Sequence, residues 1–322
     1  MSTFKDFRVS TDMGLSVNPW TVGAKAGYDL MIAALGYEER ATFAAKQLGY
    51  SASRKIAFGF MHRQVLHFKE NMDWFFKAGF EVIEAKDGEE FELAAEAALK
   101  SQSRAAGDRQ IRVCVDISSF SRQRLAFLTS FLLRHMEGKP IVDFIYAPST
   151  FAPPQEDDLP ISYCEPVTSE FGAWPVGSDL PTALICGLGY ERDRALGVDE
   201  YLDAAGSWLF FPTGPIPEFV PEVRKANAEL LEGFPLDRVI YYDLATPFAT
   251  FARLQSLVSG LVDNYRPVLV PLGPKPFALA TLLVGLAHSP HVSVWRVSAG
   301  QTEEPVDRPP QGDLVGLTVS RE

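Results

Sequence analysis

The sequence is short of positive charge. Its 322 residues include 30 Lys and Arg against 41 Asp and Glu, which gives a formal net charge of −11 at pH 7. A protein that binds along duplex nucleic acid needs a clustered cationic face to displace the counterions of the phosphates. We therefore expect no direct binding to duplex nucleic acid. The balance of 47% hydrophobic and 22% charged residues predicts a folded globular chain.

The chain also lacks a long apolar segment. No stretch approaches the roughly 18 apolar residues of a membrane-spanning helix, and residues 1–8 (MSTFKDFR) contain no apolar core of a signal peptide. We therefore expect a cytoplasmic protein without membrane contact. The three cysteines, Cys114, Cys164 and Cys186, form no C-x-x-C pair, and two of them lie in apolar runs. This pattern predicts reduced thiols packed as small core residues.

Signatures of cofactor and metal binding are missing. Gly187 and Gly189 begin a G-x-G pattern without its third glycine, which argues against a dinucleotide site of the dehydrogenase type. No G-x-S-x-G turn marks a nucleophilic serine. His62 and His67 have no third ligand nearby in sequence, so we expect surface or interface histidines and no metal site. We predict no cofactor and assign no catalytic residue. Mg²⁺ is an option only under the hypothesis that the protein is an enzyme, which would act with or without it.

The sequence does contain an internal repeat. The segment LGYEERA that begins at Leu35 recurs as LGYERDRA from Leu188, 153 residues later. Four further segments recur in the same order at offsets between 150 and 158 residues. Such collinearity predicts two copies of one domain. The further pairs are 54–61 with 207–213, 80–84 with 238–242, 113–118 with 268–273, and 142–146 with 292–296.

Each copy alternates short apolar runs with longer amphipathic segments. The apolar runs have the length of buried strands, and the segments between them carry apolar residues at helical spacing. This alternation predicts right-handed βαβ crossovers and a parallel sheet covered on both faces. The expected fold is therefore α/β: a tandem duplication of a Rossmann-like parallel-sheet domain with pseudo-two-fold symmetry. In the first copy the expected strands are 29–35, 55–61, 80–84, 111–117 and 141–147, and the expected helices are 38–48, 64–78, 89–101 and 121–136.

The predicted domain boundaries follow from composition. The first Rossmann-like half covers residues 1–147, and the second covers 181–322. Between them, residues 148–180 are rich in proline, include the acidic triplet 156–158 and show no periodicity. This composition predicts a linker strap that positions the two halves. Near the end of the chain, residues 314–319 are expected to add one short edge strand.

The candidate ligand loops follow the first and fourth strands of each half. In the common strand order 3-2-1-4-5 these strands are neighbours where the order reverses, and ligands of open α/β sheets bind outside the carboxyl ends there. After the first strand, a glycine permits close approach of a ligand, and the next helix start offers N–H groups to an anion. The alternative is a tight turn with a glutamate at a helix start and a packed tyrosine. The candidate residues are Gly36, Tyr37 and Glu38 in the first half and Gly189, Tyr190 and Glu191 in the second.

After the fourth strand of the first half, Asp116 is followed by Ser118, Ser119 and Arg122. Small hydroxyls are partners for phosphates, and an arginine in the first helical turn reaches the same group. The alternative is that a serine only caps the helix while Arg122 is solvated. The equivalent loop of the second half has lost the acid and the hydroxyls, so we expect the halves to bind phosphates unequally. Its candidate residues are Gly273 and Lys275.

Asp116, Ser118 and Arg122 form the pattern D-x-S-x-x-x-R at the end of the fourth strand. This pattern resembles the ligand loop of the CRISPR-associated Rossmann-fold (CARF) sensor domains and of the related SAVED-like sensors of antiphage systems. The resemblance covers seven residues of the first half in motif and both halves in layout. It implies paired Rossmann units that bind a cyclic oligonucleotide across their shared surface.

Three hypotheses for the function follow. The leading one is a binding module that holds a phosphorylated or nucleotide-like ligand, such as a cyclic oligonucleotide, in a cleft between its halves. It would signal to a separate protein partner that carries the effector activity, in antiphage defence. The second is an enzyme that cleaves or transfers a nucleotide or phosphoester with Asp116, Glu38 and Arg122. The third is a scaffold whose duplication serves protein contacts only.

Overall fold

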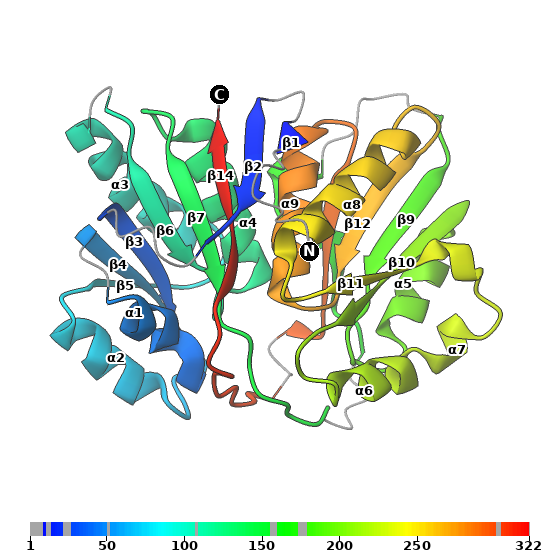
Figure 1. Cartoon of the computed structure of the whole chain (residues 1–322), viewed down its shortest axis with the longest axis horizontal. Coiled ribbons are helices and arrows are strands. Elements are labelled where there is room, and N and C mark those ends of the chain that lie inside the picture. Colours follow the sequence, from blue (N-terminus) through cyan, green and yellow to red (C-terminus); the bar gives the residue numbers. More distant parts are fainter. Residues whose placement is uncertain are drawn as a thin grey trace. The chain divides into compact units, whose positions relative to one another are not determined.

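The structure is a computed structural model, and it describes residues 9–10, 14–21, 27–49, 52–106, 109–154, 160–172, 179–300 and 304–321. The chain divides into two compact units, which are Met1–Thr150 together with Pro305–Glu322 (unit 1) and Phe151–Glu304 (unit 2). Each unit has one sheet in which parallel strands predominate, flanked by helices (Figure 1). The predicted fold class, α/β with two Rossmann-like domains in tandem, is confirmed. Among the helices of the described residues, none combines the length and the apolar character needed to cross a membrane.

Unit 1 is built on an eight-stranded sheet. Every run predicted as a strand in the first copy coincides with a strand of this sheet. The strands are β1 (Val9–Ser10), β2 (Leu15–Pro19), β3 (Tyr28–Leu35), β4 (Ala52–Phe60), β5 (Glu81–Ala85), β6 (Arg112–Asp116), β7 (Ile141–Tyr146) and β14 (Val315–Arg321). The helices are η1 (Glu39–Thr42), α1 (Phe43–Leu48), α2 (Phe68–Lys77), α3 (Glu89–Ala106), α4 (Arg122–Ser130) and the π-helical turn η2 (Phe131–His135).

The five parallel strands of unit 1 lie in the order β5-β4-β3-β6-β7. The first of them, β3, pairs with the fourth, β6, and Leu30 lies opposite Val113. This pairing confirms the predicted neighbourhood of the first and fourth strands. The chain order reverses between β3 and β6, so the loops that follow these strands leave the same edge of the sheet at its switch point.

The C-terminal strand β14 lies inside this sheet and not at its edge. It pairs antiparallel with β7 on one side and with β2 on the other (Figure 1). Leu317 and Val319 are fully buried, and the Thr318 hydroxyl donates to Asp143 of β7 at 2.6 Å. The expectation of an edge strand was wrong, because alternating apolar residues specify a strand but not its partners. The predicted second half, 181–322, includes this segment, whereas the contacts assign it to unit 1.

Unit 2 is built on a six-stranded sheet. Its elements alternate as in unit 1. The strands are β8 (Tyr163–Pro166), β9 (Thr182–Gly187), β10 (Gly206–Thr213), β11 (Val239–Asp243), β12 (Arg266–Pro271) and β13 (Ser293–Ser298). The helices are η3 (Ser169–Phe171), α5 (Arg194–Leu202), α6 (Phe219–Ala226), α7 (Ala228–Leu231), η4 (Leu236–Arg238), α8 (Pro247–Leu261) and α9 (Lys275–Ala287).

The parallel strands of unit 2 repeat the order found in unit 1. They run β11-β10-β9-β12-β13, and β9 pairs with β12 with Leu184 opposite Val268. Part of the predicted linker joins this sheet, because β8 pairs antiparallel with β13. Residues 155–159 and 173–178 of that linker, including its acidic triplet, lie outside the described residues.

Helices cover both faces of the unit 1 sheet. Ala33 of β3 and Ala57 of β4 belong to one buried cluster with Phe75 of α2. Phe58, the next residue after Ala57, meets Phe91 of α3 edge-on with ring centroids 5.3 Å apart. Successive side chains of a strand point to opposite faces. The near-continuous apolar runs of the sequence are therefore explained by burial on both sides.

The cysteines are free thiols. Cys114 in β6 and Cys186 in β9 are fully buried, as predicted, and Cys164 in β8 is half-buried. Burial raises the pKa of Cys114 and of Cys186, and nearby carboxylates add to the effect. Both thiols are therefore protonated and shielded from reagents in the folded chain.

We expect one thiol of the native protein to react with Ellman's reagent at pH 8, and all three to react after denaturation in guanidinium. Cys164→Ser removes the native reaction. Unfolded thiols ionise with pKa of about 8.5, so the stabilisation from keeping Cys114 and Cys186 protonated is complete below that pH. It is lost as the pH rises above it, and the melting temperature falls. Rapid native reaction of two or more thiols contradicts this account.

Candidate functional site

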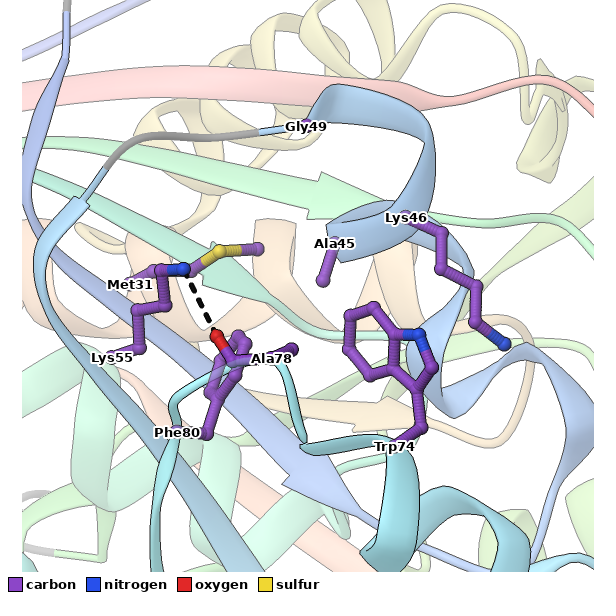
Figure 2. A pocket seen from close by; sticks show the side chains of 8 residues that line it. All are labelled: Met31, Ala45, Lys46, Gly49, Lys55, Trp74, Ala78 and Phe80. Atoms are coloured by element: carbon purple, nitrogen blue, oxygen red, sulfur yellow. Dashed lines mark hydrogen bonds between the residues drawn. The ribbon is translucent and has the colours of Figure 1, made fainter. Parts of the chain in front are cut away.

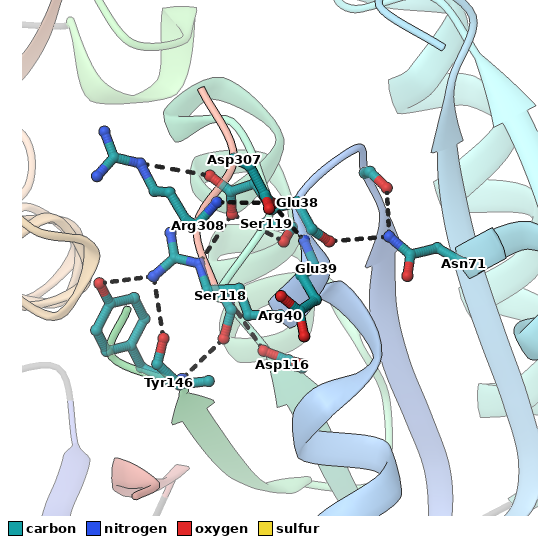
Figure 3. A network of polar contacts seen from close by, with 12 residues as sticks. Glu38, Glu39, Arg40, Asn71, Asp116, Ser118, Ser119, Tyr146, Asp307 and Arg308 are labelled. Carbon is teal, nitrogen blue, oxygen red and sulfur yellow. Dashed lines mark hydrogen bonds and ion pairs between the residues drawn. The ribbon is translucent and has the colours of Figure 1, made fainter. Parts of the chain in front are cut away.

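The loops after β3 and β6 meet at the carboxyl edge of the unit 1 sheet. A Cβ atom on Gly36 would lie 3.2 Å from the Cβ of Ser119, so the two loops are in contact. The Ser119 hydroxyl donates to the Glu38 carboxylate at 3.2 Å. The structure therefore brings together three of the residues predicted for the site. Asp116 and Ser118 belong to the same region (Figure 3).

A buried ion pair forms the centre of this region. Arg40 Nε donates to Glu38 Oε2 at 2.8 Å, and Arg40 Nη1 donates to the Tyr146 hydroxyl and the Ala147 carbonyl, each at 3.0 Å (Figure 3). The exposed fraction of the side chain is 3% for Arg40 and 10% for Glu38. Burial disfavours the guanidinium charge, but Glu38 and Tyr146 outweigh it and hold the pKa of Arg40 above its usual value. The guanidinium therefore stays charged and fixes Glu38 in place.

Asp116 and Ser118 shape the loop after β6. The Asp116 carboxylate accepts the Ser118 N–H at 2.9 Å, and the Ser118 hydroxyl accepts the Ala147 N–H at 2.8 Å. Both side chains are buried, whereas Ser119 is half-buried. These bonds join the ends of β6 and β7. Asp116 and Ser118 therefore hold the loop, and Ser119 is its more accessible hydroxyl.

Helix α4 begins directly after this loop. Ser121 caps it by accepting the Arg124 N–H at 3.2 Å. The Arg124 side chain is fully buried and donates to the carbonyls of Gly59 and Ala85, at the ends of β4 and β5, at 3.0 and 2.6 Å. This anchor fixes the first turn of α4, in which Arg122 is half-buried. Two arginines at this spacing in a sequence do not reveal which of them the fold buries.

A buried asparagine, which the sequence analysis did not single out, holds the loop after β3. The Asn71 amide donates to the carbonyls of Gly36 at 3.0 Å and of Glu38 at 2.9 Å. In unit 2, the buried Asn227 amide donates to the Gly189 carbonyl at 2.8 Å. The two asparagines are 156 residues apart, within the offsets of the internal repeat. The register of the repeat was therefore the signal that could have identified them.

Tyr37 lies among charged groups. Burial and the neighbouring Glu38 raise the pKa of Tyr37, while Arg63 and Arg308 act in the opposite direction. Its phenol is therefore protonated at neutral pH. Neither arginine was predicted for the site.

The C-terminal segment reaches the same loop. The Asp307 carboxylate accepts the Glu39 N–H at 2.9 Å, across 268 residues of sequence. Arg308 Nε lies 3.7 Å from Glu38 Oε1 (Figure 3). No local pattern in the sequence connects these residues. Only the insertion of β14 next to β7 brings them to the carboxyl edge of the sheet.

The equivalent loops of unit 2 pack backbone against backbone. A Cβ atom on Gly189 would lie 2.9 Å from the Leu272 carbonyl oxygen, and one on Gly273 would lie 2.5 Å from the Leu188 oxygen. The N–H groups of Leu272 and Gly273 both donate to the Gly187 carbonyl at 3.0 Å. Gly189 and Gly273 are therefore required for the close approach of the two loops.

Tyr190 belongs to an aromatic cluster of unit 2. Its ring stacks on Phe219 with centroids 5.9 Å apart, and Phe219 meets Phe151 edge-on at 5.1 Å. Glu191 and Lys275 are half-buried, and Lys275 is the first residue of α9. The predicted residues of unit 2 thus surround a more apolar and more closely packed edge than those of unit 1.

Figure 2 shows a pocket of unit 1, whose lining residues are not members of this network. It adjoins the amino ends of β4 and β5, the opposite edge of the sheet from the loops described above. Lys46 Nζ lies 5.2 Å from the centroid of the Trp74 ring, and Lys55 Nζ donates to the Ala78 carbonyl at 3.1 Å. Both lysines that line the pocket therefore already interact with other residues of its wall. The lining residues are Met31, Ala45, Lys46, Gly49, Lys55, Trp74, Ala78 and Phe80.

The fold defines this chain as an α/β protein of two Rossmann-like units. No protein-family model matches its sequence, and no curated protein matches it. Among solved structures, "Structure of a Type III CRISPR defence DNA nuclease activated by cyclic oligoadenylate" is similar to it with a TM-score of 0.48 and 10% sequence identity. The similarity covers 83% of this chain and 64% of that chain. This chain therefore spans less than two thirds of the length of that nuclease.

Removal of Arg40 should destabilise the fold strongly. Arg40→Met leaves the Glu38 carboxylate buried without its cation, and we expect a loss of about 3–5 kcal/mol in the free energy of unfolding, measured by urea denaturation. Glu38→Gln combined with Arg40→Met should cost less than the sum of the single changes. Lys100→Met, which breaks only an exposed pair with Glu96, is the control and should cost about 0.2–0.5 kcal/mol. Equal effects at Arg40 and Lys100 contradict the role of the buried pair.

Gly273→Ala should destabilise unit 2, because the added carbon would lie 2.5 Å from the Leu188 oxygen. We expect a cost of about 1–3 kcal/mol, as for other overpacked sites. Gly260→Ala in α8, where a Cβ atom meets nothing within 4 Å, should stabilise by about 0.5–1 kcal/mol. Melting temperatures that move in the same direction for both variants would be inconsistent with this packing.

Proposed function

We propose that unit 1 binds a phosphorylated or nucleotide-like ligand at the loops after β3 and β6, and that the protein is a binding module that signals to a separate protein partner. The observation that supports this most is the contact of these two loops at the switch point of the sheet. Ligands of open α/β sheets bind at this position.

The groups at this edge suit an anionic ligand. Ser119 offers a half-buried hydroxyl, Arg122 lies in the first turn of α4, and the Arg308 side chain is 26% exposed. Arginine matches phosphate oxygens in geometry and charge, and a helix N-terminus adds a partial positive charge. The Glu38 carboxylate is neutralised by Arg40 at 2.8 Å. An approaching phosphate therefore meets Arg122 and Arg308 beside a Glu38 carboxylate that is already paired.

A cyclic oligonucleotide is the ligand to test first, because the pattern of Asp116, Ser118 and Arg122 resembles the ligand loop of CARF sensor domains. On that reading the protein acts in antiphage defence, and its partner carries the effector activity. The proposed roles of Asp116 and Ser118 are to hold the loop, while Ser119 and Arg122 contact the ligand.

The enzyme hypothesis assigns catalysis to Asp116, Glu38 and Arg122. Glu38 is held by Arg40 and Ser119, and Asp116 accepts the Ser118 N–H. Both carboxylates are buried. These contacts favour supporting roles, and therefore favour binding over cleavage.

A thermal-shift screen of the intact chain tests the proposal. We expect the melting temperature to rise with a nucleotide ligand in a panel of mononucleotides, dinucleotides and cyclic oligonucleotides, each with and without Mg²⁺. A ligand at 100 times its dissociation constant stabilises the folded chain by about 2.7 kcal/mol. Recovery of the unchanged ligand by chromatography distinguishes a binding module from an enzyme. If no member of the panel shifts the melting temperature, the proposal fails and the scaffold hypothesis is favoured.

Arg122→Ala should weaken binding of the ligand found in that screen by about ten- to over a hundredfold. It removes a charge-assisted hydrogen bond worth roughly 1.5–3 kcal/mol. Arg109→Ala is the matched control, because Arg109 precedes β6 at the opposite edge of the sheet and pairs only with Asp29 among the contacts shown here. Isothermal titration calorimetry measures the ligand affinity of both variants. Equal affinities of the two variants would place the ligand elsewhere.

A further inference from the structure

Three potential metal ligands from three remote parts of the sequence meet in unit 1. Glu39 begins η1, His67 precedes α2, and Asp307 lies in the C-terminal segment. One donor atom from each lies within 4.8 Å of the others. Two ligands of one tetrahedral zinc ion, each at about 2.0–2.2 Å, lie about 3.3–3.6 Å apart. His67 Nε2 and Asp307 Oδ2 are 3.2 Å apart and already have this spacing. Rotation of the exposed Glu39 side chain brings its carboxylate to the same distance and closes the group around a cation.

The Asp307 carboxylate is oriented by the backbone. Its Oδ1 accepts the N–H groups of Glu39 at 2.9 Å and of Arg308 at 2.8 Å. Its other oxygen, Oδ2, lies 3.2 Å from Nε2 of His67. Hydrogen bonds of this kind hold a ligating carboxylate in position and leave its second oxygen for a metal.

His67 is fixed from its backbone. Its N–H donates to the Tyr37 carbonyl at 3.1 Å, and its carbonyl accepts the Asn71 N–H at 2.9 Å. Asn71 in turn binds the carbonyls of Gly36 and Glu38. The segment that carries His67 and the segment that carries Glu39 are thus joined by hydrogen bonds. The backbones that carry these two ligands are therefore held in place without an ion.

The donor set indicates the class of ion. One imidazole nitrogen with two carboxylates suits a divalent transition metal, whereas Mg²⁺ and Ca²⁺ take oxygen ligands almost exclusively. The exposed fractions of the His67 and Asp307 side chains, 43% and 29%, leave the cluster accessible to an ion from solution. The neighbouring cation Arg308 is directed to Glu38, at 3.7 Å from Oε1.

We propose that Glu39, His67 and Asp307 form a binding site for a divalent transition metal of the zinc type, with water completing the tetrahedral coordination. The sequence pattern predicts no metal here, because no third ligand lies near His62 and His67 in the sequence. The third ligand comes from the end of the chain. A bound ion would join the C-terminal segment to the loop after β3 and to the start of α2, and would stabilise unit 1. This site does not depend on the ligand proposed for Ser119 and Arg122.

Zinc binding by the full chain tests the proposal. After removal of metals with EDTA, calorimetric titration with Zn²⁺ should show one ion bound per chain, and Zn²⁺ should raise the melting temperature. His67→Ala and Asp307→Asn should each weaken binding by more than about tenfold. Loading with Co²⁺ should produce visible d–d absorption in the wild type, and His67→Ala should remove it.

His62→Ala is the matched control, because His62 lies in the same loop outside the cluster and packs against Phe60; its affinity for Zn²⁺ should equal that of the wild type. If His67→Ala or Asp307→Asn fails to fold, Glu39→Gln serves as the test, because the Glu39 side chain is exposed. This variant should also bind Zn²⁺ more than about tenfold more weakly than the wild type. Absence of saturable Zn²⁺ binding by the wild type overturns the proposal, and so does undiminished binding by the folded variants. His67 and Asp307 would then form a side-chain contact only.

Discussion

The buried ion pair of Arg40 and Glu38 determines the arrangement of the carboxyl edge of unit 1. Two charges withdrawn from water cost several kcal/mol each unless other groups hydrogen-bond to them. Tyr146 and Ala147 at the end of β7 and Ser119 in the loop after β6 supply these bonds. Each bond that the pair requires therefore also fixes the end of a neighbouring strand relative to β3. These hydrogen bonds therefore set the positions of the loops that form the candidate site.

The two units hold the loops after their first and fourth parallel strands with different side chains. Both place the first parallel strand beside the fourth, and both hold the glycine after the first strand with an amide, from Asn71 in unit 1 and Asn227 in unit 2. In unit 1 the space between the two loops is filled by polar side chains. In unit 2 that space is absent, because Gly189 and Gly273 allow the backbones to touch. The polar groups that suit an anion are therefore concentrated in unit 1.

The sequence predicts the strands of both units well, because strands buried on two faces are short and almost wholly apolar. It also predicts that the loops with Gly36 and Ser119 come together, since strand order alone fixes their proximity. It does not predict which of Arg122 and Arg124 is buried, because both lie in the first turn of one helix. Nor does it place Asp307 beside Glu39, because that contact depends on pairing between strands far apart in the chain.

Strand β14 comes last in the chain, yet it fills the place between β2 and β7, which precede unit 2. During synthesis from the N-terminus, the β7 edge of the unit 1 sheet stays unpaired while residues 151–304 are made. An unpaired strand edge is a template for association with other chains, and pairing between distant segments is slow. The last strand of the unit 1 sheet is therefore made after all the strands of unit 2, and the domain that begins first is the last to close.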